Sequence, residues 1–189
     1  MEREFTATET FEHAGRYPVL QWLFMHKLGI LLSDGVAAEL LTEVEAAASK
    51  MKASVERVAP QIGGVKSNDG AWIEVQQRID GGPSVLYDAV FLMLTKESAI
   101  TLCSNAAAVD FVSDAYAHCK YIGFVAGALP LLQRCHVPAE DEGVIEIGNA
   151  RDIKSFLQSC GALRVWPREA KVFAEPSHRH SQSSRPKRS

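Results

Sequence analysis

The chain has 189 residues, of which 47% are hydrophobic and 23% are charged, and this balance predicts one folded domain with a sizeable core. No run approaches the roughly 18 apolar residues of a membrane span, and the acidic start is unlike a signal peptide, so we expect a cytoplasmic protein without membrane contact. The net charge of −3 combines a basic C-terminal stretch with an acidic body, and an acidic body argues against nucleic-acid binding.

The first 25 residues form an arm that precedes the predicted domain. The arm begins with a polar stretch rich in Glu and Thr, and it becomes apolar from Tyr17 to Met25. An apolar segment needs a surface to pack on, which we expect to be its own domain or a neighbouring subunit. The side chains expected to anchor it are Tyr17, Leu20, Trp22, Leu23 and Phe24.

From residue 26 on, short apolar runs alternate with stretches of helical periodicity. The runs 27–33, 52–59 and 87–94 predict buried strands, and apolar residues recur at helical spacing over 36–48. Between the second and third strands, Asn68-Asp69-Gly70 favours the positive φ angles of a tight turn and predicts a small β-hairpin.

The alternation continues through the rest of the domain, which we place at residues 26–172. The further elements expected are a helix from the cap Asn105 to Cys119, a strand 121–126, a short helix to Cys135, a strand 144–148, a helix 150–160 and an edge strand 163–166. This order predicts an α/β fold, a flavodoxin-like three-layer α/β/α sandwich with a mostly parallel sheet. Residues 173–189 are expected to form a disordered basic tail.

Three loops could contribute catalytic or ligand-binding residues, because ligands of open α/β sheets bind beyond the carboxyl ends of the strands. They contain Asp34, Thr95 and Val125. The third loop has the outline of a nucleophile elbow, a tight strand-to-helix turn that projects one side chain above the sheet. Covalent catalysis there needs Cys or Ser, whereas the loop offers Val125, Ala126 and Gly127. We therefore expect a degenerate crevice, in which Asp34 caps the following helix rather than acting as a base.

Several stretches of this sequence, in their order and spacing, point to a known family. They are Leu28–Gly35, Tyr87–Phe91, Asp110–His118, Ile122–Ala128, Glu142–Ile145 and Arg164–Trp166. With them, residues 26–172 resemble the C-terminal domain of large-subunit haem catalases, a relative of the PfpI and class I glutamine amidotransferase superfamily. The resemblance implies a domain that binds no haem and is associated with stability, subunit assembly and, in some members, chaperone-like behaviour.

The resemblance also shows what this chain has lost relative to catalytic members of the superfamily. Their nucleophilic Cys matches Val125 here. Their acidic residue near the start of the first helix matches the stretch 36–38, which has no acid, and their Gly-Gly turn for the oxyanion matches Thr95–Glu97. Losses of this kind cost about 10⁴ to 10⁶ in rate for a nucleophile and a further 10² to 10³ for an oxyanion donor.

Cys103 is the remaining candidate for a relocated nucleophile. It precedes the helix expected at Asn105, and a helix N-terminus can lower the pKa of a thiol. The pairs His118-Cys119 and Cys135-His136 lack the spacing of a zinc site, so we predict no metal. With no CxxC pair or secretory signal, the four cysteines are expected to be reduced.

These observations favour an interaction or scaffold domain over an enzyme. We expect it to act by self-association as a homo-oligomer, or by chaperone-like binding of other proteins, without a cofactor. The alternative is a small hydrolase, deglycase or thiol-based stress protein that uses Cys103. A third hypothesis is a sensor whose crevice binds a metabolite anion at a helix N-terminus.

Overall fold

Six parallel strands form the central sheet of the computed structural model, which describes residues 27–174. The strands lie in the order β5-β2-β1-β6-β7-β8, and every pair of neighbours is parallel. Their bounds are β1 Lys27–Leu32, β2 Ser54–Ala59, β5 Gln77–Arg78, β6 Ala89–Met93, β7 Tyr121–Phe124 and β8 Val144–Glu146. The mostly parallel α/β sheet expected from the sequence is confirmed. The apolar runs that predicted buried strands correspond to its central strands.

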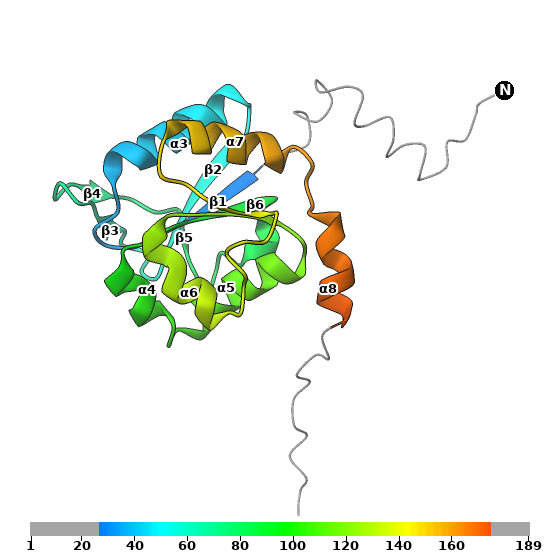
Figure 1. The fold of residues 1–189 in the computed structure, drawn as a ribbon. Coiled ribbons are helices and arrows are strands. Elements are labelled where there is room, and N and C mark those ends of the chain that lie inside the picture. The colour runs from blue at the N-terminus through cyan, green and yellow to red at the C-terminus, as the bar shows by residue number, and fades with distance from the viewer. Residues whose placement is uncertain (1–26, 175–189) are drawn as a thin grey trace, which may run out of the picture.

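Helices cover both faces of this sheet (Figure 1). One face carries α3 (Ala38–Lys50) and α7 (Ala150–Cys160), and the other carries α4 (Lys96–Leu102), α5 (Ala106–Ala117) and α6 (Leu129–Arg134). Side chains alternate along each strand, so Ile30 packs towards α3 and α7 while Leu31 packs towards the opposite layer. The result is two hydrophobic cores, one on each side of a three-layer sandwich.

The predicted hairpin is present beside the carboxyl edge of the sheet. Its strands are β3 (Val65–Lys66) and β4 (Trp72–Ile73), joined by a turn in which Gly70 has a φ of 89°. Asn68 in this turn accepts a hydrogen bond from the backbone N–H of Ala38 at 3.3 Å. The hairpin therefore supplies the cap of α3, which has none from its own N-cap residue.

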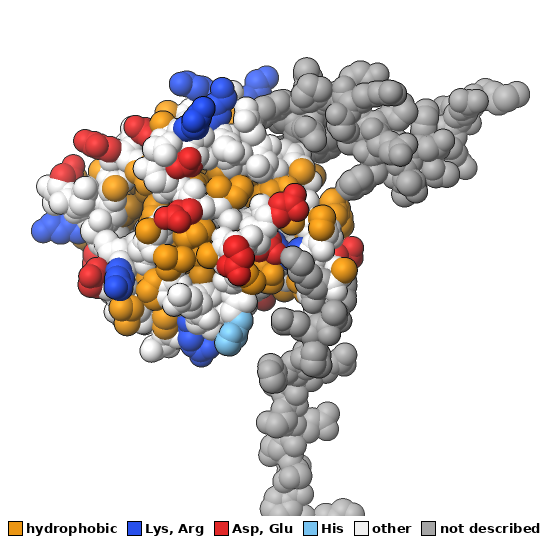
Figure 2. Space-filling model, in the orientation of Figure 1, with side chains coloured by type: hydrophobic (Ala, Val, Ile, Leu, Met, Phe, Trp, Pro, Cys, Tyr) orange, Lys and Arg blue, Asp and Glu red, His pale blue; other side chains and the backbone are white. Residues whose placement is uncertain are grey.

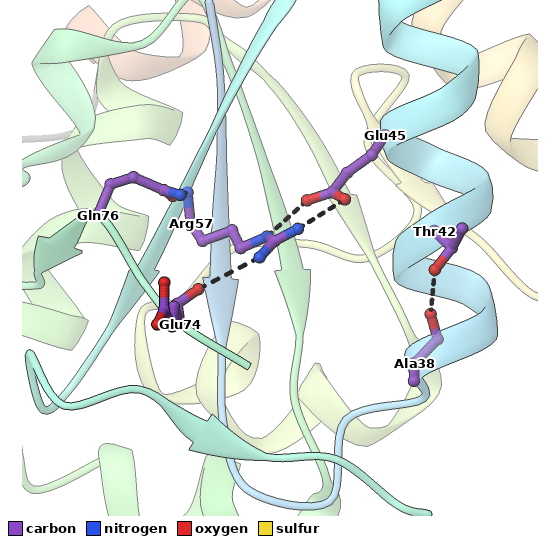
Figure 3. A network of polar contacts seen from close by, with 6 residues as sticks. All are labelled: Ala38, Thr42, Glu45, Arg57, Glu74 and Gln76. Atoms are coloured by element: carbon purple, nitrogen blue, oxygen red, sulfur yellow. Dashed lines mark hydrogen bonds and ion pairs between the residues drawn. The ribbon is translucent and has the colours of Figure 1, made fainter. Parts of the chain in front are cut away.

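An arginine on β2 links the sheet to α3 and to the segment after the hairpin (Figure 3). Arg57 on β2 donates two hydrogen bonds, of 2.6 and 2.8 Å, to the carboxylate of Glu45 on α3. It also donates to the backbone carbonyl of Glu74 at 3.4 Å. The hydrogen bonds to Glu45 raise the pKa of Arg57, which keeps its guanidinium charged in this contact.

A second set of buried polar groups holds the C-terminal segment against the amino edge of the sheet. The guanidinium of Arg168, which is 1% exposed, donates to Asp141 at 2.6 and 3.0 Å and to the carbonyl of Lys120 at 2.7 Å. Lys120 is also 1% exposed, and its ammonium donates to the carbonyls of Ser84 and Tyr87. These bonds tie the 3₁₀ turns η1 (Ser84–Leu86) and η3 (Trp166–Arg168) to the sheet.

The clearest differences from the sequence expectations are helix α4 and the segment 163–166. Helix α4 occupies residues that we expected to be a loop. Thr95 caps this seven-residue helix, which buries Ala99 and Leu102, and two buried positions are too few to give a clear helical pattern in the sequence. The expected edge strand 163–166 is wrong. Val165 donates to the carbonyl of Cys119 at 2.7 Å, and the chain then turns through η3, which contains Pro167, into α8 (Glu169–Ala174).

The predicted arm, with Tyr17, Trp22 and Phe24, lies outside the described residues, as does nearly all of the predicted tail from residue 175 on. Among the helices within 27–174, none is long and apolar enough to cross a membrane.

Candidate functional site

A small cleft lies at the carboxyl edge of the sheet, above the point where a nucleophile would stand. Its volume is about 170 Å³. The lining residues are Gly35, Val36, Ala37, Leu40, Met93, Leu94, Thr95 and Val125. None of these side chains titrates near neutral pH, so they supply no general acid or base, and the hydroxyl of Thr95 has no base among them to activate it as a nucleophile.

Val125 has the position of an elbow residue but a relaxed backbone. It follows β7 directly, with φ −91° and ψ 154°, and its N–H donates to Leu92 at 3.0 Å, which extends the pairing of β7 with β6. A nucleophile elbow is instead a sharp and strained turn. The 3₁₀ turn η2 (Ala126–Ala128) follows, and a Cβ at Gly127 would lie 2.2 Å from the carbonyl oxygen of Leu94. Gly127 thus permits close packing of this turn against the end of β6.

Thr95 lies in the same cleft as Val125 and serves as the N-cap of α4. Its hydroxyl accepts from the N–H of Ser98 at 3.3 Å and donates to the Ser98 hydroxyl at 2.9 Å. Its own N–H donates to the hydroxyl of Ser33 at 3.3 Å. The N–H groups of Thr95 and Ser98 are therefore engaged within the protein, which argues against their forming an oxyanion hole.

Asp34 does not cap α3, so that expectation is wrong. Its carboxylate accepts from the N–H of Lys66 at 2.8 Å and holds the hairpin instead. The residue is exposed and does not line the cleft at Val125. The structure thus brings Thr95 and Val125 together and leaves Asp34 on a neighbouring surface.

That neighbouring surface is a larger groove of about 360 Å³ between the hairpin and α4. Asp34 and Glu97 are its charged lining residues, and Ser33, Ser98, Thr101 and Asn105 add hydroxyl and amide groups. Two carboxylates without a cation disfavour the metabolite anion that the third hypothesis requires. The sequence could not reveal this groove, because one of its walls is the unpredicted helix α4.

Cys103 lies at the C-terminal end of α4 rather than at the start of the next helix. It is the C-cap residue of α4, while Asn105 caps α5 as predicted, accepting from Ala108 at 3.2 Å. The half-buried Sγ of Cys103 lies 3.2 Å from the carbonyl oxygen of Ala99 and 3.5 Å from that of Pro130. It lines neither of the two clefts at the carboxyl edge.

The remaining thiols are also free and sequestered to different degrees. Cys119 and Cys160 are buried, and Cys135 is half-buried. Burial raises the pKa of each of these three thiols, most strongly at Cys160. Among residues 27–174, no group of three or more His, Cys, Asp or Glu side chains is arranged to hold a metal ion.

Comparison with known proteins agrees with this architecture. Residues 26–170 match the model of the C-terminal domain found in long catalases. The chain belongs to this family. It is 50% identical over 148 residues to Catalase C of Rhizobium meliloti, and 30% identical over 152 residues to Catalase HPII of Pseudomonas aeruginosa. These matches cover 77% and 80% of the chain but 21% of each catalase. The catalase C-terminal domain of this chain therefore spans about a fifth of the length of its curated relatives.

Solved structures place the fold of this catalase C-terminal domain among DJ-1/ThiJ/PfpI-like proteins. DJ-1beta of Drosophila melanogaster superposes with a TM-score of 0.63 and 12% identity, covering 79% of this chain and 96% of that one. A DJ-1 superfamily protein from Salmonella typhimurium gives 0.62 and 20% identity, covering 79% and 95%. At these identities the likeness shows a common fold and nothing about activity.

Proposed function

We propose that this catalase C-terminal domain is a non-catalytic interaction domain that works by association, either with a second copy of itself or with exposed apolar segments of other proteins. The observation that carries the proposal is the cleft at Val125. An aliphatic side chain stands at the nucleophile position, on a relaxed turn, and none of the lining residues that the structure describes around it carries a titratable group. Conversion of such a cleft into an acyl-transfer site would need several new groups at once.

The apolar arm supports association as the mode of action. Residues 17–25 include Trp22 and Phe24, which are typical of the aromatic anchors at protein interfaces. Among the described residues, the two cores of the domain are built from side chains between Leu28 and Cys160. Four free cysteines support a reducing compartment such as the cytoplasm.

Size-exclusion chromatography with light scattering tests self-association. The full chain is expected to have the mass of an oligomer, and a chain that starts at Met25 is expected to be a folded monomer. Circular dichroism of the shortened chain verifies that its sheet and helices persist. An unchanged mass and thermal stability after the truncation would contradict the role of the arm.

A further inference from the structure

A groove of about 660 Å³ lies between α3 and α7, on the opposite side of the sheet from α4, α5 and α6. Its floor is apolar and is built from Ala46, Ala47, Met51, Ala150 and Ile153. Lys50 and Lys154 stand at its rim, together with Glu43. The volume lies within the range of binding clefts, about 300 to 1,000 Å³, and an apolar floor with a charged rim suits an apolar peptide segment.

The surface around this groove carries charges of both signs, with a small excess of basic groups. Lys50, Lys52, Arg151 and Lys154 are exposed there, against the exposed Glu39 and Glu43 of α3. Figure 2 shows Lys and Arg side chains at the top of the domain, with Asp and Glu side chains beside them. Residues 1–16 of the arm have the opposite character, with four Glu against two Arg. The excess of basic groups around the groove would attract this acidic part of the arm.

The length of the arm fits the groove. The nine residues 17–25 span up to about 30 Å when extended, and the 13-residue helix α3 is about 20 Å long. The segment can therefore cover the whole length of the groove. Its aromatic side chains Tyr17, Trp22 and Phe24 would each bury about 150 to 250 Å².

We propose that residues 17–25 of one copy lie in the α3–α7 groove of a second copy, and that the exchange is reciprocal. This inference rests on the proposed self-association and assigns the surface that receives the arm. Three aromatic residues bury about 600 Å² per arm, so two exchanged arms reach about 1,200 Å², the lower bound of stable interfaces. A two-fold arrangement of this kind closes at the dimer and leaves no groove open for further growth.

The substitution Ala46→Glu tests the groove within the full chain. Ala46 is exposed on α3, so Glu is tolerated by the helix but places a carboxylate in the apolar floor. We expect the dimer dissociation constant to rise at least tenfold. The matched control is Ala106→Glu, which makes the same change at an exposed position of α5 in the opposite layer, and it should leave the constant unchanged.

Mixing two defective chains distinguishes exchange between copies from docking within one copy. The chain that starts at Met25 keeps an intact groove, and the Ala46→Glu chain keeps an intact arm. Only one arm and one groove can pair in this mixture, so we expect a heterodimer weaker than the wild-type dimer, detected by light scattering of the concentrated mixture under conditions in which each chain alone is a monomer. Absence of the heterodimer would overturn exchange between copies. If the full-length Ala46→Glu chain remains dimeric, the assignment of the α3–α7 groove as the docking site is wrong. If the full-length wild type is already a monomer and truncation of the arm changes nothing, the proposed self-association itself is wrong.

Discussion

Val125 determines whether the carboxyl edge of this sheet retains any catalytic potential. Its neighbours in the cleft are aliphatic side chains, glycine and Thr95. A thiol becomes reactive beside a cation, a basic imidazole or free helix N–H groups, and this cleft presents no cationic or imidazole side chain. A cysteine placed at Val125 would therefore lack activating side chains among the described lining residues of the cleft.

The variant Val125→Cys tests that conclusion directly. We expect it to fold with a loss of about 1 kcal/mol, because only about one buried methyl group is removed. Its new thiol should titrate near the ordinary pKa of about 8.5, measured from the pH dependence of iodoacetamide labelling at that residue. A pKa below about 7 would show that activating groups remain in the cleft.

Cys103 gives a second prediction at the scale of single residues. Its Sγ contacts two carbonyl oxygens, which accept a hydrogen bond from a thiol but cannot stabilise a thiolate. Iodoacetamide at neutral pH should therefore modify Cys103 slowly, as it should the buried Cys119 and Cys160. All four sites should label fast in urea, which serves as the control. Fast and selective labelling of Cys103 in the native protein would revive the thiol-enzyme alternative.

Among the secondary-structure elements, the C-terminal turns depend on Arg168. Its guanidinium pairs with Asp141 in the interior and stacks over the ring of Tyr116, 4.4 Å from the ring centroid. Substitution of Arg168 by Met should lower the free energy of unfolding by about 3 to 5 kcal/mol, because it leaves a buried carboxylate without its cation. Urea denaturation measures the loss. The control Arg134→Met, at an exposed position, should change stability by less than about 0.5 kcal/mol.

The sequence predicted the sheet well because its central strands are long apolar runs. Strands β1, β6 and β7 and the cap Asn105 have strong local signals, and all were found where expected. The short elements have weak signals. Strand β5 has two residues, and α4 begins with a polar segment that looks like a loop.

The candidate site was predictable only in part, because its parts come from separate segments. The elbow position at Val125 follows from the strand-to-helix pattern, and the loss of a nucleophile there can be read from one residue. The role of Asp34 could not be read in the same way, since its partner Lys66 lies 32 residues away on a two-residue strand. The α3–α7 groove likewise depends on how two distant helices pack.

At the scale of the whole molecule, the stability should respond to pH through Lys120. Burial, and then the charge of Arg164, lower the pKa of Lys120 from 10.5 to about 8. Between these values the unfolded chain binds a proton that the folded chain has released, so the folded state gains stability as the pH rises. Below pH 8 both states carry the charge, and the folded state bears the full cost of burying it.

Comparison of the wild type with Lys120→Met isolates this effect from other titrating groups. The difference in the free energy of unfolding between the two proteins should grow from pH 7 to pH 10 in favour of the wild type. Lys96→Met, at an exposed position of α4, is the control and should show a constant difference. A difference that stays constant or shrinks for Lys120→Met would contradict the lowered pKa. Urea denaturation at each pH provides the measurement.

The central position of β1 also governs how the chain acquires its structure. Strand β1 pairs with β2 on one side and with β6 on the other, and the contact between Lys27 and Asp88 joins residues 61 positions apart. Pairs so distant in sequence form slowly, because the loop between them must close first. During synthesis on the ribosome, β1 remains open on one side until residue 93 has emerged. Completion of β6 then leaves β6 open on its far side until β7 (Tyr121–Phe124) pairs with it, so we expect the nascent chain to become protected from aggregation once β7 has emerged.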